Sequence, residues 1–80
     1  MKIVKAAAAL KHLIQLRLDA LPCVDEDDAR ILARDVQWHA TDEDGRNWDM
    51  RGYHGPLDYA TDVRLVVDRL RREYLLEERA

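Results

Sequence analysis

The spacing of apolar residues changes twice along this chain, and this change restricts the possible fold more than any other feature. In residues 3–21 apolar side chains recur every three or four positions, as they do on one face of an α-helix. In residues 36–53 they alternate with polar residues, which is typical of a half-buried strand. The helical spacing returns over residues 57–78. The sequence therefore predicts an α+β fold in the order α-α-β-β-α, in which helices cover one face of a two-stranded antiparallel hairpin.

Three helices are predicted, and their ends are set by proline and by carboxylates. The first spans residues 3–21, because Pro22 disfavours helical geometry in the residue before it. A short second helix begins at Asp25, which can cap it, and runs to about Arg34, with acidic residues in its first turn. The third occupies residues 57–78. The apolar stripes of the two long helices consist of Ile3, Ala7, Leu10, Ile14, Leu18 and Leu21, and of Ala60, Val63, Val67, Leu70 and Tyr74.

The hairpin is predicted to turn at Glu43, Asp44 and Gly45, with Gly45 in the left-handed conformation. A loop of this length fixes which residues face each other on the two strands. The expected pairs are Asp42 with Arg46, Ala40 with Trp48, Trp38 with Met50, and Val36 with Gly52. In this register the large apolar side chains share one face, and both tryptophans pack on the helices. A two-stranded hairpin depends on such packing for its stability.

The length of 80 residues indicates a single domain over residues 1–80. A core this small leaves self-association into a homodimer open. The lone Cys23 excludes an intrachain disulfide, so nothing requires an oxidising compartment. Charged residues interrupt the apolar run near the start, which argues against a signal peptide, and no apolar run has the length of a membrane helix. We therefore expect a cytoplasmic protein.

Candidate catalytic residues are few. In the predicted register His39 faces Asp49 across the hairpin, and with His54 they suggest a metal-dependent hydrolase. A solvated cross-strand pair is the simpler interpretation of His39 and Asp49. Four carboxylates lie within five residues after Cys23, and they disfavour a reactive thiolate. The sequence has no glycine-rich phosphate loop, CxxC pair or HExxH motif, so we expect no enzyme and no catalytic residue, metal or cofactor.

The net charge of −3 is unevenly distributed, with +4 in residues 1–18, −8 in residues 19–62 and +1 in residues 63–80. An acidic surface of this kind can occupy a basic groove of a partner protein, and long-range attraction speeds that association. Tyr53 and Tyr59 are candidate interface anchors. The alternative interpretation, a solvated surface that only keeps the chain soluble, stays open. The candidate partner-binding residues are Asp25, Glu26, Asp27, Asp28, Asp42, Glu43, Asp44 and Asp49.

A second functional hypothesis is a small nucleic-acid-binding or regulatory module that uses the arginine-rich last helix. Its candidate contacts are Arg64, Arg71, Arg72 and Arg79. The sequence pI of about 5.5 argues against this hypothesis, because an acidic centre repels phosphates over much of their approach. Direct binding to nucleic acid or to a membrane is therefore not favoured.

An acidic α+β chain of this length, with one cysteine and no catalytic motif, resembles the anti-CRISPR proteins, which are small inhibitors encoded by phages and mobile elements. The resemblance rests on size, charge and architecture across the whole chain, and it carries over no functional residue. It implies a protein that binds a CRISPR effector complex in a bacterial cell and blocks access to target DNA. The sharpest expectation is thus a non-enzymatic inhibitor that occludes a basic, nucleic-acid-handling protein complex.

Overall fold

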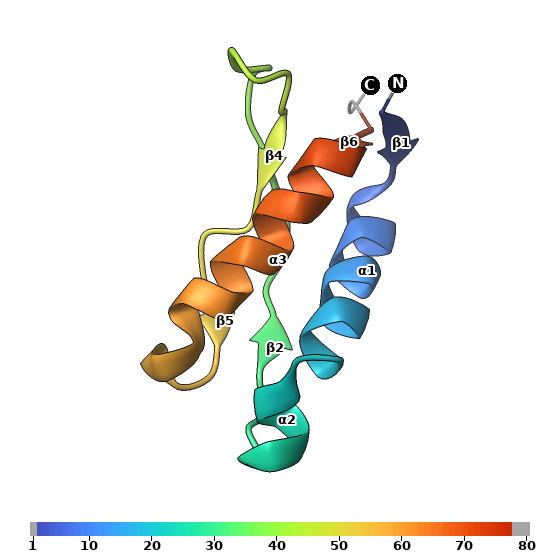
Figure 1. Cartoon of the computed structure of the whole chain (residues 1–80). Coiled ribbons are helices and arrows are strands. Elements are labelled where there is room, and N and C mark those ends of the chain that lie inside the picture. Colours follow the sequence, from blue (N-terminus) through green and yellow to red (C-terminus); the bar gives the residue numbers. More distant parts are fainter. Residues whose placement is uncertain (1, 78–80) are drawn as a thin grey trace.

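The computed structural model describes residues 2–77 as an elongated α+β molecule of 40 × 22 × 20 Å (Figure 1). The predicted fold class is confirmed, and so is the approximate order of the elements. No helix within residues 2–77 is both long and apolar enough to cross a membrane. The elements are β1 Ile3–Lys5, α1 Ala7–Asp19, α2 Pro22–Glu26, β2 Leu32–Ala33, β3 Gln37–Trp38, β4 Trp48–Asp49, β5 Tyr53–His54, the 3-10 turn η1 Leu57–Tyr59, α3 Ala60–Glu73 and β6 Tyr74–Leu76.

The core lies between α1, α3 and the strands β2 and β4. The apolar stripes of the two long helices meet there as the spacing predicts, and burying them stabilises both helices. Trp48 and Met50 extend this core into the irregular strands. The buried helical residues are Leu10, Ile14 and Leu18 of α1, and Val63, Val67 and Leu70 of α3.

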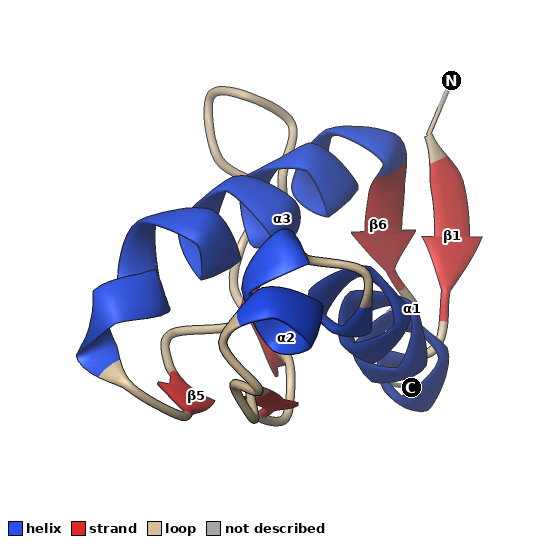
Figure 2. Cartoon of the chain, turned by 60° about the horizontal axis from the view of Figure 1, so that its bottom comes forward, coloured by secondary structure: helices blue, strands red, loops and turns tan. Residues whose placement is uncertain are grey.

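Both long helices are shorter than predicted, because each gives up one end to a strand. β1 and β6 pair in parallel, with Ile3 opposite Tyr74 (Figure 2). Ala6 and Tyr74 both have extended backbone conformations, which stop the helices on either side of this pair. The prediction that Ile3 and Tyr74 belong to helical stripes is therefore wrong. The expected last residue of the third helix, Glu78, lies outside the described residues.

The predicted second helix is also wrong in its extent. α2 begins at Pro22, whose fixed backbone angle suits a first helical position, and it is only five residues long. Asp25 lies inside this helix and does not cap it. Asp28 has a φ of 52°, and the chain then runs extended so that Leu32 and Ala33 form β2. The apolar residues after Asp28 therefore pack from a strand.

The strands between α2 and η1 form one long ribbon in place of a simple hairpin. β3 pairs with β4 and β2 pairs with β5, and the same antiparallel register continues through both ladders. The turn is confirmed: the Asp42 N–H donates to the Arg46 carbonyl oxygen at 2.9 Å, and Gly45 has a φ of 75°. Beyond it Trp38 pairs with Trp48 and not with Met50, because Ala40 and Thr41 are extra residues on one strand.

The contact that sets this register comes from the far end of the chain. The buried side-chain amide of Asn47 donates to the carbonyl oxygen of Leu76 and accepts from its N–H, both at 2.9 Å. Trp48 is fully buried beside it, and its Nε1–H donates to the Tyr74 carbonyl oxygen at 3.0 Å. Trp38 remains 56% exposed, so the expectation that both tryptophans pack in the core is wrong. These bonds to β6 hold the ribbon against the chain end.

Candidate protein-binding surface

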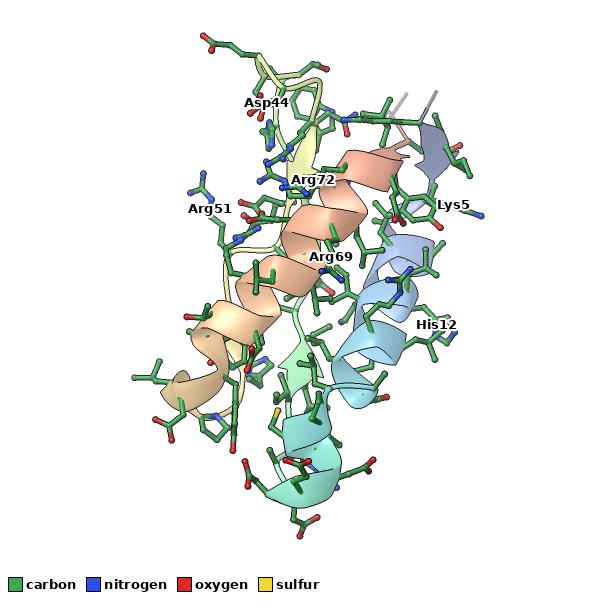
Figure 3. All side chains as sticks on the ribbon, in the orientation of Figure 1. Lys5, His12, Asp44, Arg51, Arg69 and Arg72 are labelled. Carbon is green, nitrogen blue, oxygen red and sulfur yellow. The ribbon has the colours of Figure 1, made fainter. Side chains whose placement is uncertain are left out.

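The acidic residues expected to bind a partner fall into two groups far apart on the molecule. Asp44 stands at the tip of the ribbon beyond β4, whereas α2 forms the opposite end of the long axis (Figures 1 and 3). Glu43 and Asp44 are exposed at the tip, and all four acidic residues at positions 25–28 are exposed at the other end. The eight candidates therefore do not form one continuous surface.

Asp49 is engaged inside the molecule. Its carboxylate accepts from the Arg64 guanidinium at 2.7 Å, and only 21% of its side chain is exposed. Arg64 also pairs with Asp68 at 2.9 Å, one helical turn along α3. Asp49 thus fastens the ribbon to α3, and little of its charge faces a partner.

Arg71 is the centre of this internal network. Its side chain is 12% exposed, and its Nε donates to the Trp48 carbonyl oxygen at 2.7 Å. Its guanidinium also lies 3.7 Å from carboxylate oxygens of Asp42 and Asp68. A planar group with several donors suits this position, because one side chain meets a backbone carbonyl and two carboxylates together.

His39 belongs to the same network and does not face Asp49 as the predicted register required. Its Nδ1 lies 2.7 Å from the Ala40 carbonyl oxygen, so that nitrogen carries the proton, and Nε2 accepts from Arg71 at 3.2 Å. The residue opposite Asp49 is Gln37, and His54 lies in the other ladder of the ribbon. Within residues 2–77 no group of three side chains is placed to hold a metal ion.

Asp42 builds the turn of the ribbon. Its Oδ1 accepts from the N–H groups of Arg46 at 2.9 Å and Asp44 at 3.0 Å. The hydrogen bond from Arg46 is the main reason why the pKa of the Asp42 carboxyl lies below its ordinary value. Lys2 adds a positive charge at the same place by donating to the Gly45 carbonyl oxygen at 2.8 Å. At the tip, only Glu43 and Asp44 keep free carboxylates among the described residues.

The other end of the molecule is more strongly acidic. We call Asp25, Glu26, Asp27, Asp28 and Asp58 the acidic end. No arginine or lysine of residues 2–77 lies within 4.0 Å of any of these carboxylates. The Tyr59 hydroxyl donates to Asp27 at 3.3 Å and so joins η1 to α2. Burial and the Asp27 carboxylate raise the pKa of Tyr59.

The structure exposes several large apolar side chains that the sequence did not identify as candidate anchors, Leu57 and Trp38 among them. Leu57 is 87% exposed and directly precedes Asp58 of the acidic end, while Trp38 is exposed on β3. Tyr53 and Tyr59 are partly buried and bond within the molecule, to the Pro56 carbonyl oxygen and to Asp27. The position of Leu57 directly after Gly55 and Pro56, at a chain reversal, was the available signal.

The arginines proposed for nucleic-acid binding are largely occupied. Arg64 and Arg71 hold the internal carboxylates, whereas Arg72 is exposed on α3 and Arg79 lies outside the described residues. Cys23 is partly buried in α2. The chain matches no known protein family, no curated protein and no solved structure.

The pair between Asp49 and Arg64 predicts a pH dependence of stability. Burial would raise the pKa of Asp49, but the hydrogen bond from Arg64 and the charges of Arg64 and Arg71 outweigh it and hold the pKa below its ordinary value. Such a carboxyl stabilises the fold above its unfolded pKa of about 3.9, and this contribution is lost as the pH falls through the lower, folded pKa.

The free energy of unfolding should therefore be higher for the native chain than for Asp49→Asn at about pH 7, and the difference should shrink below about pH 4. Urea unfolding of both proteins across this range measures it. A difference that stays constant with pH would contradict the assigned ion pair.

Proposed function

We propose that this chain is a non-enzymatic binding protein whose acidic end docks on a basic surface of a nucleic-acid-handling protein complex. Docking there excludes the nucleic acid by steric and electrostatic occlusion. The sharpest form of this proposal is an inhibitor of a CRISPR effector complex, in keeping with the resemblance in size, charge and architecture.

One observation carries the proposal: the five carboxylates of the acidic end have no cationic partner within residues 2–77. Asp49 differs from these residues, because Arg64 and Arg71 neutralise its charge. A group of unpaired carboxylates repels itself and projects a negative potential into solvent. A partner's arginines and lysines relieve this repulsion on binding, and the long-range field accelerates the encounter.

The acidic end is a better contact than the tip of the ribbon. At the tip, Lys2 and the backbone N–H of Arg46 offset part of the negative charge. The Asp42 carboxylate is already hydrogen-bonded within the turn. The exposed Leu57 directly precedes Asp58 of the acidic end, and its side chain can enter an apolar pocket of the partner. Carboxylates that speed association thus lie next in sequence to an apolar side chain that can slow dissociation.

Two double variants with the same change in charge test this assignment. Asp25→Lys with Glu26→Lys reverses two charges at the acidic end, and Glu43→Lys with Asp44→Lys reverses two at the tip. All four residues are exposed, so both variants should keep nearly the native circular-dichroism melt. Each immobilised protein is used to capture partners from a lysate of the native host, and captured proteins are identified by mass spectrometry.

We expect the native chain and the tip variant to capture the same nucleic-acid-handling complex, and the acidic-end variant to lose it by at least about tenfold. Capture retained by the acidic-end variant and lost by the tip variant would move the contact to Glu43 and Asp44. Equal capture by all three proteins would reject electrostatic docking altogether.

The alternative function, nucleic-acid binding by α3, has weaker support. Arg71 is nearly buried and Arg64 is held by two carboxylates, so neither presents a free guanidinium to a phosphate. A salt-dependent gel shift that is lost on replacing Arg71 and Arg72 would favour this alternative over protein binding.

A further inference from the structure

The ribbon contains a gap between its two ladders. β2–β5 and β3–β4 share one register, but no backbone hydrogen bond of the described chain links residues 34–36 to residues 50–52. In that register Arg34 stands opposite Gly52, and Arg51 stands opposite Asp35. The Arg34 N–H instead donates to the sulfur of Met50 at 3.3 Å. The two strands therefore separate where two arginines face each other diagonally.

A hollow of about 430 Å³ opens at this gap. Four basic side chains from different parts of the chain line it: Lys11 of α1, Arg34 after β2, Arg51 after β4 and His54 of β5. The Gln37 amide adds a neutral donor at its edge. Arg51 extends outward from the segment between β4 and β5 (Figure 3). This positive charge stands in contrast to the acidic end.

The positive charge of the hollow is only partly neutralised from within. Asp35 is its acidic member, and Lys11 pairs with it at 2.8 Å. No carboxylate of residues 2–77 lies within 4.0 Å of Arg34 or Arg51. Two guanidinium groups without a carboxylate partner among residues 2–77 therefore remain beside one hollow.

Gly52 has no side chain to fill the part of the hollow beside Arg34. A Cβ atom at this position would lie 3.8 Å from Cδ of Arg34, in ordinary contact, so the Arg34 side chain lies across bare backbone. The guanidinium is thereby positioned over the gap by the strand opposite. Guanidinium groups recognise phosphate oxygens through paired, charge-assisted hydrogen bonds, and an imidazole or amide adds further donors.

We propose that this hollow is a binding site for a phosphate-bearing small molecule, with Arg34 and Arg51 as its principal contacts. Its size lies within the range of small-molecule sites. The cations converge on one hollow and do not form a track, whereas a nucleic acid requires an extended basic stripe. This site is separate from the acidic end and does not depend on the function proposed for it.

Titration of the full chain with inorganic pyrophosphate, at constant ionic strength in chloride, tests the proposal. Amide resonances of residues 34–37 and 51–54 should shift saturably in heteronuclear NMR spectra, with a dissociation constant below about 1 mM. Arg34→Gln should weaken binding by roughly tenfold or more, since it removes a charge-assisted contact. Arg34 is the better variant because Arg51 also lines a hollow on the α3 side.

Arg30→Gln is the matched control, since Arg30 is exposed, lies four residues earlier and does not line this hollow. It should leave pyrophosphate binding unchanged, as should charge reversal at Asp25 and Glu26. Shifts that do not saturate by about 20 mM, or equal weakening by Arg34→Gln and Arg30→Gln, would overturn the site. Tighter binding of a short single-stranded oligonucleotide than of pyrophosphate at these resonances would overturn its assignment to a small molecule.

Discussion

Replacing Trp48 with alanine is expected to lower the free energy of unfolding by about 3–5 kcal/mol, which is a large part of the stability of a domain of this size. Trp48 has no exposed surface and is the largest fully buried side chain. Its loss leaves a cavity between the ribbon and the helices, and it also removes the hydrogen bond from Nε1 to the Tyr74 carbonyl oxygen. The substitution thus weakens the core and the attachment of β6 together.

The matched control is Trp38→Ala, because Trp38 stands directly opposite Trp48 in the ribbon. More than half of the Trp38 side chain is exposed, so its removal should cost less than about 1.5 kcal/mol. Urea unfolding followed by far-ultraviolet circular dichroism measures both changes. Similar losses for the two variants would contradict the observed register and return both tryptophans to the core.

Arg71→Ala is expected to cost about 3 kcal/mol, because it leaves several partly buried acceptors without their donor and their compensating charge. Without the guanidinium, the Trp48 carbonyl oxygen and His39 Nε2 lose their donors. The carboxylates of Asp49 and Asp68 also lose part of their compensating charge. Arg71→Lys keeps the charge but cannot reach both the carbonyl and the carboxylates, so we expect an intermediate loss.

Arg72 provides the comparison for this prediction, since it is the next residue on α3 and its side chain is exposed. Arg72→Ala should change the free energy of unfolding by no more than about 0.5 kcal/mol. Thermal and urea unfolding of the three variants separates a structural role from a general effect of charge. Equal and small changes at both positions would show that the internal network contributes little to stability.

The parts of the fold that local sequence determines were predictable. The spacing of Leu10, Ile14 and Leu18, and of Val63, Val67 and Leu70, identified the buried faces of both helices, because amphipathic periodicity is a local property. The turn between Asp42 and Arg46 was predicted from Gly45, whose left-handed backbone it requires.

The parts that depend on distant contacts were not predictable in this way. β1 pairs with β6 across nearly the whole chain, so no local pattern distinguishes Ile3 in a strand from Ile3 in a helix. The ribbon register depends on Asn47, whose side chain binds the backbone of Leu76. A register predicted from the length of the turn takes no account of that bond. The prediction therefore placed Trp38 in the core and paired His39 with Asp49.

In the candidate site, too, local sequence identifies the residue types, whereas distant contacts decide where their side chains lie. The sequence identified the acidic residues, but counting charges could not separate Asp49, which Arg64 neutralises, from Asp25, which no described cation approaches. Tertiary packing makes that separation, since α3 brings Arg64 and Arg71 to the ribbon. The acidic end and the basic hollow are both consequences of this arrangement.

Competition between this chain and nucleic acid for the captured partner tests whether docking of the acidic end excludes nucleic acid. The affinity of the partner complex for its nucleic acid is measured at increasing concentrations of the native chain and of the Asp25→Lys, Glu26→Lys variant. We expect the native chain to lower this affinity as it saturates the partner, and the Asp25→Lys, Glu26→Lys variant to lower it at least about tenfold less effectively. A partner that keeps its full nucleic-acid affinity while saturated with the native chain would contradict it.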